Sequence, residues 1–188
     1  EMDSMLTGEN YTRSYSYKYG MRTYYVNSEG SARKYFYDSS EGLYNPQFDV
    51  VGPVTMSQNM AYYGKNDMSG NDKRPEKMMY DACKLVDDSV DFSLYDNDKD
   101  GVMDFVYVLY AGYGEADGGD ANTIWPHQYY LSSYSYLSLD NTQIDRYACS
   151  NEMDNYTKHH TGIGTFCHEF SHVLGLPDLY ETTNTGYH

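Results

Sequence analysis

Apolar positions near the end of the chain repeat as they do in an α-helix. They fall at three- and four-residue steps, at Ile163, Phe166, Cys167, Phe170, Val173 and Leu174. Gly175 can adopt the left-handed backbone that ends a helix, and Pro177 cannot continue one. The pattern predicts a helix with one apolar face that stops near residue 175.

Two further segments have helical character. Residues 31–42 read as a short helix that stops near Gly42. Residues 75–90 read as a longer helix, because Pro75 suits the first helical position. Its apolar residues recur at helical spacing, at Met79, Ala82, Cys83, Val86 and Val90.

Strands are expected between these helices. Residues 102–112 form a near-continuous apolar run that is typical of a buried strand. Residues 142–150 alternate weakly, and residues 46–54 read as a strand with a bulge, bend or edge position at Gly52–Pro53. The first 30 residues are polar and tyrosine-rich, with weak periodicity. The alternation of helices and strands predicts an α/β layered domain with a mixed sheet.

Composition narrows the range of functions. A chain of 188 residues with 40% hydrophobic residues and a net charge of −15 fits one globular domain. The charge repels nucleic acids and anionic membranes, and no apolar run reaches membrane-spanning length. We therefore expect no nucleic-acid partner and no membrane insertion. The same charge is compatible with calcium binding.

The chain contains three cysteines, so at least one thiol has no partner within the chain. Cys83 is expected to be a buried core thiol. Cys149 and Cys167 could pair in a secreted protein, and the sequence leaves that pairing open.

The predicted C-terminal helix carries a group of metal-binding type. At 100° per residue, His172 lies about 40° from His168, and Glu169 about 100°. Two imidazoles one turn apart can reach one ion, and neutral imidazole is a good zinc ligand. Glu169 is turned too far to be the obvious third ligand. It is placed instead to take a proton from a water molecule at the site.

A third ligand has to come from beyond the helix. If the chain turns at Gly175, Asp178 can swing back toward the histidines. Glu181, one turn later, is the alternative. The competing interpretation is that the two histidines lie on a solvent-exposed helix face and bind no metal.

An acidic segment has the spacing of a calcium loop. Its expected ligands are Asp96, Asp98, Asp100, Asp104 and the carbonyl of Val102, with Gly101 at the sharp turn. Because Tyr107 stands where an EF-hand has glutamate, this is a calcium loop of another kind. An ordinary acidic turn is the alternative.

Four other residues have simpler interpretations. Trp125 is expected to be a packing anchor, and His127 a hydrogen-bonded structural residue that could instead line the cleft. His159 and His160 are expected to belong to a polar connection.

The segment TFCHEFSHVLGLPDLY resembles the zinc motif of the immune-inhibitor-A-like family of secreted bacterial metallopeptidases. GSARKYFYDSSEGLYNPQFDVVGPV, DNDKDGVMDFVYVLYAGYGE and IWPHQ also fit the pattern of that family, and the resemblance spans about residues 28 to 182. It implies a zincin-type catalytic domain, with a twisted mixed sheet backed by helices and a metal helix under an open cleft. It also implies that His168, His172 and Asp178 are zinc ligands, that Glu169 is the general base, and that calcium binds near Asp96 to Asp104.

The implied activity is endopeptidase cleavage of extracellular proteins or peptides by a secreted bacterial enzyme. Residues 1–188 are expected to be a metallopeptidase catalytic domain, mostly its N-terminal subdomain. A first core strand and a C-terminal methionine turn are expected to be missing. Residues 107–114 are a candidate edge for holding substrate. Two rival interpretations are a calcium-stabilised binding module or inactive fragment, and a zinc hydrolase that acts on small amides.

Overall fold

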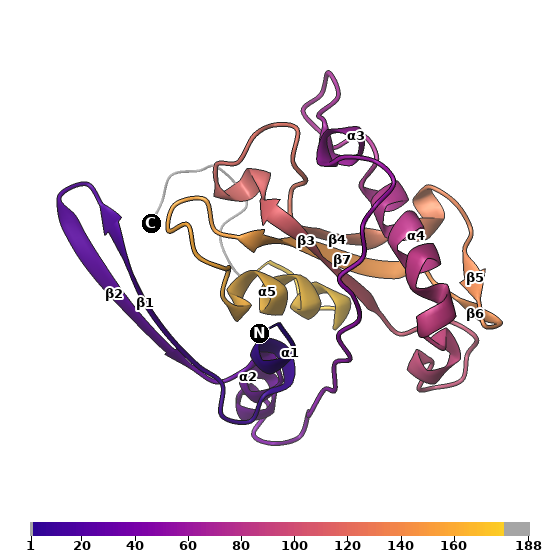
Figure 1. Ribbon diagram of the computed structural model, residues 1–188. Helices are drawn as coiled ribbons and strands as arrows, with labels where there is room; N and C mark the ends of the chain where they lie inside the picture. The colour runs from indigo at the N-terminus through magenta and orange to yellow at the C-terminus, as the bar shows by residue number, and fades with distance from the viewer. Residues whose placement is uncertain (1, 179–188) are drawn as a thin grey trace.

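A mixed three-stranded sheet lies at the centre of the computed structural model, which describes residues 2–178 (Figure 1). Strands β3 (Val106–Tyr113) and β7 (Arg146–Met153) are parallel, and β4 (His127–Tyr130) pairs antiparallel with the other side of β7. The mixed sheet expected from the sequence is confirmed.

Helices cover both faces of this sheet. Helix α5 (Ile163–Val173) packs on one face, and α1 (Met2–Thr7) and α2 (Ala32–Ser39) cover the far side of α5. Helix α4 (Pro75–Val86) and the short α3 (Met60–Gly64) lie on the opposite face. Helix α5 is therefore held between the sheet and the N-terminal helices.

Short elements connect these layers. They are the 3-10 turns η1 (Asp87–Ser89), η2 (Phe92–Tyr95), η3 (Glu115–Asp117) and η4 (Leu131–Ser133), and the small ribbon of β5 (Ser138–Leu139) and β6 (Thr142–Gln143). Among the described residues, no helix has both the length and the apolar character needed to cross a membrane.

Aromatic packing fixes the position of α5. The ring centroid of Phe170 lies 5.1 Å from that of Phe36 on α2, 5.0 Å from Phe105 and 5.3 Å from Phe48. Phe166 lies 4.5 Å from Tyr107 on β3. Edge-to-face and tilted contacts at these separations stabilise aromatic clusters beyond the area they bury. The helix is thereby held by neighbours from three separate segments: α2, the chain around Phe48, and the start of β3.

The N-terminal region contains a hairpin that the sequence did not lead us to expect. Strands β1 (Thr12–Tyr19) and β2 (Arg22–Glu29) pair along their whole length and extend away from the sheet (Figure 1). Gly20, with φ +60°, supplies the first residue of the two-residue turn.

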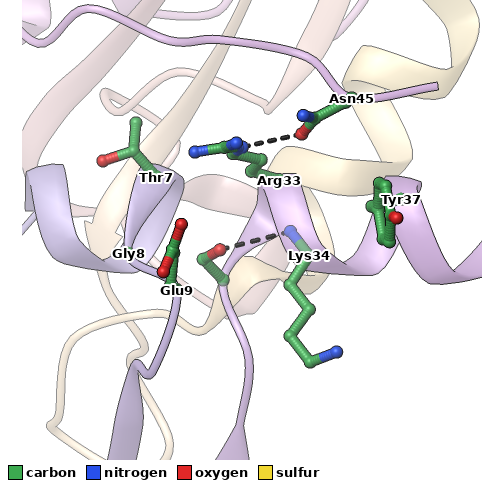
Figure 2. Close-up of a pocket in the computed structure, with 8 residues that line it drawn as sticks. Thr7, Gly8, Glu9, Arg33, Lys34, Tyr37 and Asn45 are labelled. Carbon is green, nitrogen blue, oxygen red and sulfur yellow. Dashed lines mark hydrogen bonds between the residues drawn. The ribbon is translucent and has the colours of Figure 1, made fainter. Parts of the chain in front are cut away.

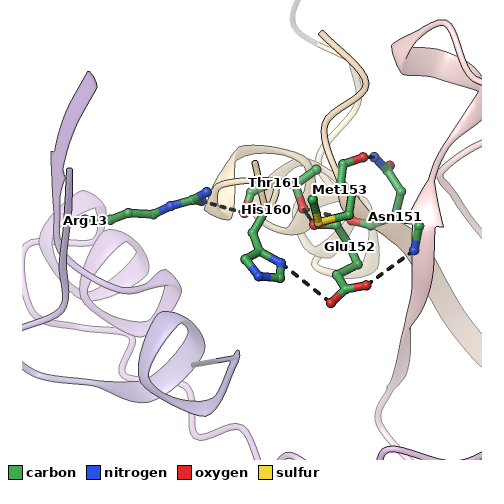
Figure 3. Close-up of polar contacts among 7 residues, drawn as sticks. Arg13, Asn151, Glu152, Met153, His160 and Thr161 are labelled. Atoms are coloured by element: carbon green, nitrogen blue, oxygen red, sulfur yellow. Dashed lines mark hydrogen bonds and ion pairs between the residues drawn. The ribbon is translucent and has the colours of Figure 1, made fainter. Parts of the chain in front are cut away.

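The base of the hairpin contacts the connection that precedes α5. Arg13 of β1 donates a hydrogen bond to the carbonyl of Thr161 at 3.2 Å, and His159 contacts the Ser16 carbonyl at 3.2 Å. Figure 3 also shows the Glu152 carboxylate beside His160, 3.6 Å from its Nδ1. The expected polar connection at His159 and His160 is confirmed.

The three predicted helices are confirmed as α2, α4 and α5, with Pro75 at the first position of α4, which ends at Val86 and is followed by the 3-10 turn η1. Residues 106–113 form the expected strand, β3, which lies at an edge of the described sheet and is mostly half-buried. The strand expected over 46–54 is wrong. Gly52 has φ +114°, which does not continue a strand, and Pro53 has no N–H to donate, so this segment pairs with no strand.

All three cysteines are buried free thiols. Cys83 belongs to the core beneath α4, as expected. Cys149 packs on the α4 side of the sheet, whereas Cys167 packs on the α5 side. The pairing that the sequence left open is therefore not formed, and burial raises the pKa of the Cys167 thiol to about 12.

Candidate metal centre

Helix α5 presents its two histidines beside each other while its apolar face is buried. The imidazole of His168 is 41% exposed and that of His172 is 23% exposed. The rings meet edge to face, with centroids 4.6 Å apart. The one-turn spacing read from the sequence therefore brings both rings to one side of the helix.

The end of α5 directs the chain back toward these rings. Gly175 has φ +89°, its N–H donates to the carbonyl of His172 at 3.0 Å, and the Leu176 N–H donates to Ser171 at 3.0 Å. This pair of bonds is the Schellman arrangement, which favours glycine at the left-handed position. Arg146 of β7 donates to the Val173 carbonyl at 2.9 Å and so satisfies another terminal group. The glycine stop predicted from the sequence is confirmed.

Asp178 consequently lies against both histidines. Its Oδ1 is 3.5 Å from Nε2 of His168 and 3.3 Å from Nε2 of His172. The two Nε2 atoms are 3.2 Å apart. Three ligand atoms bound about 2.0–2.1 Å from a tetrahedral zinc ion would be separated by about 3.3 Å. The alternative ligand Glu181 lies outside the described residues.

The tautomer of His172 follows from the hydrogen bond of its Nδ1 atom. Nδ1 lies 2.9 Å from the carbonyl of Leu176, which can only accept a hydrogen bond. The proton of the neutral ring is therefore on Nδ1, and Nε2 keeps a lone pair directed toward His168 and Asp178. A backbone carbonyl in this position commonly orients a metal-binding histidine.

Glu169 occupies a buried position next to the histidine pair. The whole residue is 6% exposed, and its carboxylate lies within 4.8 Å of the ligand atoms of His168 and His172. Burial raises the pKa of Glu169 to about 7, with His172 lowering it and Asp178 raising it further. A carboxylate withdrawn from water in this way binds a proton more readily than a surface glutamate does.

A cleft of about 350 Å³ opens over the N-terminal half of α5. Its helix side consists of Gly164, Thr165, His168 and Glu169. Its opposite wall consists of Ala116, Asp117, Trp125 and Pro126, from the loop between β3 and β4. Of the residues in the histidine group, His168 and Glu169 thus border this cleft.

Trp125 is held by its backbone while its ring stays accessible. The Asp72 carboxylate accepts a hydrogen bond from the Trp125 N–H at 2.9 Å, and Nδ1 of His127 donates to its carbonyl at 2.7 Å. The residue is 55% exposed, so the packing role expected from the sequence is wrong. His127 also contacts the Tyr147 hydroxyl at 2.9 Å, which confirms its structural role.

The same loop is anchored from the sheet by a buried amide. Asn151 of β7 has no exposed surface, and its Nδ2 donates to Asp117 at 2.7 Å and to the Met153 carbonyl at 2.8 Å. Its Oδ1 has no hydrogen-bond partner. Asp117 and Asn151 could not be identified from the sequence, because nothing in their spacing links a loop to a strand residue 34 positions later.

The acidic loop predicted to bind calcium is partly assembled. Carboxylate atoms of Asp96, Asp98 and Asp100 lie within 4.8 Å of one another, and Gly101 has φ +86° at the turn. The N–H groups of Asp100 and Gly101 donate to the Asp96 carboxylate at 3.1 and 3.0 Å.

The two other predicted calcium ligands lie outside that group of three. The Asp104 carboxylate accepts a hydrogen bond from Asn97. Val102 forms an isolated parallel bridge with Gln143.

A second hollow lies over α1 and α2 (Figure 2). Its cationic groups are already engaged, since Arg33 donates to Asn45 at 2.7 Å and Lys34 pairs with Asp38 at 2.7 Å. It shares no residue with the cleft over α5, so we do not include it in the candidate site.

Two known bacterial proteins are similar to this chain. The chain is 29% identical over 178 residues to the pre-pro-metalloprotease PrtV of Vibrio cholerae, a match that covers 83% of this chain and 19% of the relative. It is 28% identical over 180 residues to immune inhibitor A of Bacillus thuringiensis subsp. alesti, covering 82% of this chain and 26% of that protein. The chain thus spans about a fifth to a quarter of the length of these relatives. No solved structure gives a significant match.

The family description that matches is "Immune inhibitor A peptidase M6, catalytic domain", and the match runs over residues 4–188. This region includes every segment on which the resemblance to the family was first based, together with the histidine pair and the cleft. The chain therefore belongs to the immune inhibitor A peptidase M6 family.

Proposed function

We propose that this chain is the catalytic part of a secreted bacterial zinc endopeptidase of zincin type that cleaves extracellular proteins. The observation that carries the proposal is the triangle formed by Nε2 of His168, Nε2 of His172 and Oδ1 of Asp178, with sides of 3.2 to 3.5 Å. Family membership and the printed names of the two relatives support the peptidase activity.

The donor set fits zinc in both chemistry and number. Two imidazole nitrogens and one carboxylate oxygen are ligands that zinc accepts, and a catalytic site keeps a fourth position open. His168, His172 and Asp178 would hold the ion. When bound, zinc would polarise the scissile carbonyl and acidify a water molecule.

Glu169 is the residue we assign to proton transfer. Its carboxylate borders the cleft next to the histidines, and burial raises its affinity for a proton. It accepts a proton from the attacking water and delivers one to the leaving amine. On an ideal helix Glu169 lies about 100° from His168, so we assign it to the water molecule and not to a ligand position.

The substrate backbone is best accommodated along β4. This strand pairs with β7 on one side only, and the loop leading into it supplies Trp125 and Pro126 to the cleft wall. An extended peptide can add to such an edge through backbone hydrogen bonds. Residues 107–114, the edge candidate from the sequence, also lie at a sheet edge, but none of them lines the cleft. We therefore assign the substrate edge to β4.

Digestion of casein tests the proposed function. The purified protein should cleave casein, a zinc chelator should stop cleavage, and added zinc should restore it. A matched assay with small amide substrates distinguishes an endopeptidase from a hydrolase of small amides. Chelator-resistant cleavage, or activity confined to small amides, would contradict the proposal.

We also propose that the acidic loop binds calcium in a structural role. Carboxylate oxygens are the ligands calcium prefers, and the positive φ of Gly101 allows Asp96, Asp98 and Asp100 to gather at one turn. The loop follows η2 directly and leads to β3, so an ion bound there would stabilise the start of the sheet.

Calcium should raise the melting temperature of the protein, because a ligand that binds only the folded state stabilises that state. Asp98→Ala should remove most of this increase. Asp88→Ala, which removes an exposed carboxylate from η1, serves as the matched control and should keep the increase. Equal calcium-induced shifts in all three proteins would rule out this loop as the binding site.

A further inference from the structure

The wall of the cleft opposite α5 combines one carboxylate with one aromatic face. Asp117 and Trp125 both line the cleft, together with Ala116 and Pro126. Among the described residues that line it, none is a lysine or an arginine. Asp117 therefore lines a cleft in which no lysine or arginine is available to pair with it.

The arrangement that holds Asp117 in this position lowers the stability of the fold. Asn151, which holds its Oδ2 at 2.7 Å, is fully buried, and the Oδ1 of the same amide has no hydrogen-bond partner. Leaving a buried polar atom unpaired is unfavourable for stability. Gly114 leaves the room for this amide, since a Cβ at that position would lie 2.6 Å from Asn151 Oδ1. Such an arrangement suits a carboxylate whose position serves binding.

Trp125 is fixed in a similar way. Asp72 and His127 hold its N–H and its carbonyl, and the residue as a whole is more than half exposed and lines the cleft. Among the neutral side chains, the indole offers the strongest face for a cation, and apolar neighbours such as Pro126 can cover an aliphatic stem.

We propose that Asp117 and Trp125 form a specificity pocket for a lysine or arginine side chain of the peptide substrate. The cationic head would pair with Asp117, and the stem and charge would lie against Trp125. Asn151 acts as a positioning residue through Asp117. This inference rests on the proposed peptidase function, because the pocket borders Glu169 and His168.

Two peptides that differ only at one residue, lysine in one and norleucine in the other, test this pocket. Their binding is measured with zinc present in the Glu169→Gln protein, so that no cleavage occurs. The single tryptophan of the chain is Trp125, and its fluorescence reports occupation of the pocket directly. The lysine peptide should bind at least about 10-fold more tightly than the norleucine peptide.

Asp117→Asn in the same background should bring this ratio close to one. Asp88→Asn removes one negative charge at η1, outside the cleft, and should leave the ratio unchanged. A ratio near one before mutation, a ratio that survives Asp117→Asn, or no binding of either peptide would overturn the proposal. Cleavage of the two peptides by the unmodified protein is measured separately, and failure there would count against the peptidase function even if the binding preference holds.

Discussion

Replacement of Glu169 by glutamine should lower peptidase activity by about 100- to 10,000-fold, the usual contribution of a positioned acid–base residue. Glutamine keeps the size of the side chain and most of its packing in the buried position of Glu169. It cannot accept the proton of the attacking water, so the loss should appear in kcat. Zinc content should stay the same, because the proposed ligands are other residues.

The measurement is casein or peptide turnover together with metal analysis of the same samples. Glu29→Gln changes an exposed glutamate at the end of β2 and provides the matched control, which should keep full activity. Activity within a few-fold of the unmodified protein would refute the general-base role of Glu169. Loss of zinc in Glu169→Gln would show that this residue acts as a ligand.

Replacement of His172 by alanine should weaken zinc binding at least about 100-fold, since even loss of a partner that only orients a ligand costs about 10- to 100-fold. His172 contributes Nε2 to the triangle, and its Nδ1 bond to Leu176 also holds the turn that carries Asp178. Both contributions disappear in the alanine variant. Zinc affinity is measured by competition with a chelator of known affinity.

His159→Ala is the matched control, because His159 contacts the hairpin rather than the cleft. It should bind zinc as the unmodified protein does. Equal zinc affinity in His172→Ala would contradict the assignment. Comparison of Asp178→Ala with Glu181→Ala then identifies the third ligand as the residue whose loss releases zinc.

Local signals explain which elements could be predicted from the sequence. Pro75 and the apolar repeat after it define α4 without reference to any other part of the chain. The same holds for the end of α5, where Gly175 and Pro177 fix the stop. The hairpin of β1 and β2 carried a comparable signal, since serine and tyrosine alternate before Gly20. It was missed because tyrosine has both an apolar ring and a polar hydroxyl. Alternating tyrosines therefore do not distinguish a buried face of a strand from an exposed one.

Other features depend on contacts between distant segments. Val50 and Val51 have the composition of a strand, but they are 43% and 49% exposed and pair with no strand. The exposure of Trp125 follows from hydrogen bonds to Asp72 and His127, which hold its backbone at the cleft. For the candidate site, the spacing of His168 and His172 was informative because both lie on one helix. The opposite wall of the cleft comes from another loop, which no spacing could place.

The proposed metal ligands all lie in one short stretch, between residues 168 and 178. An ion bound there would close a very small loop, so it would remove little conformational entropy from the unfolded chain. It would also join no two distant parts of the domain, unlike a disulfide or metal clip that spans a long loop. The aromatic packing of Phe166 and Phe170 connects α5 to the sheet and to α2 whether or not the ion is present. Metal binding and the stability of the fold thus depend on different contacts. Loss of the metal would remove catalysis and leave the protein folded.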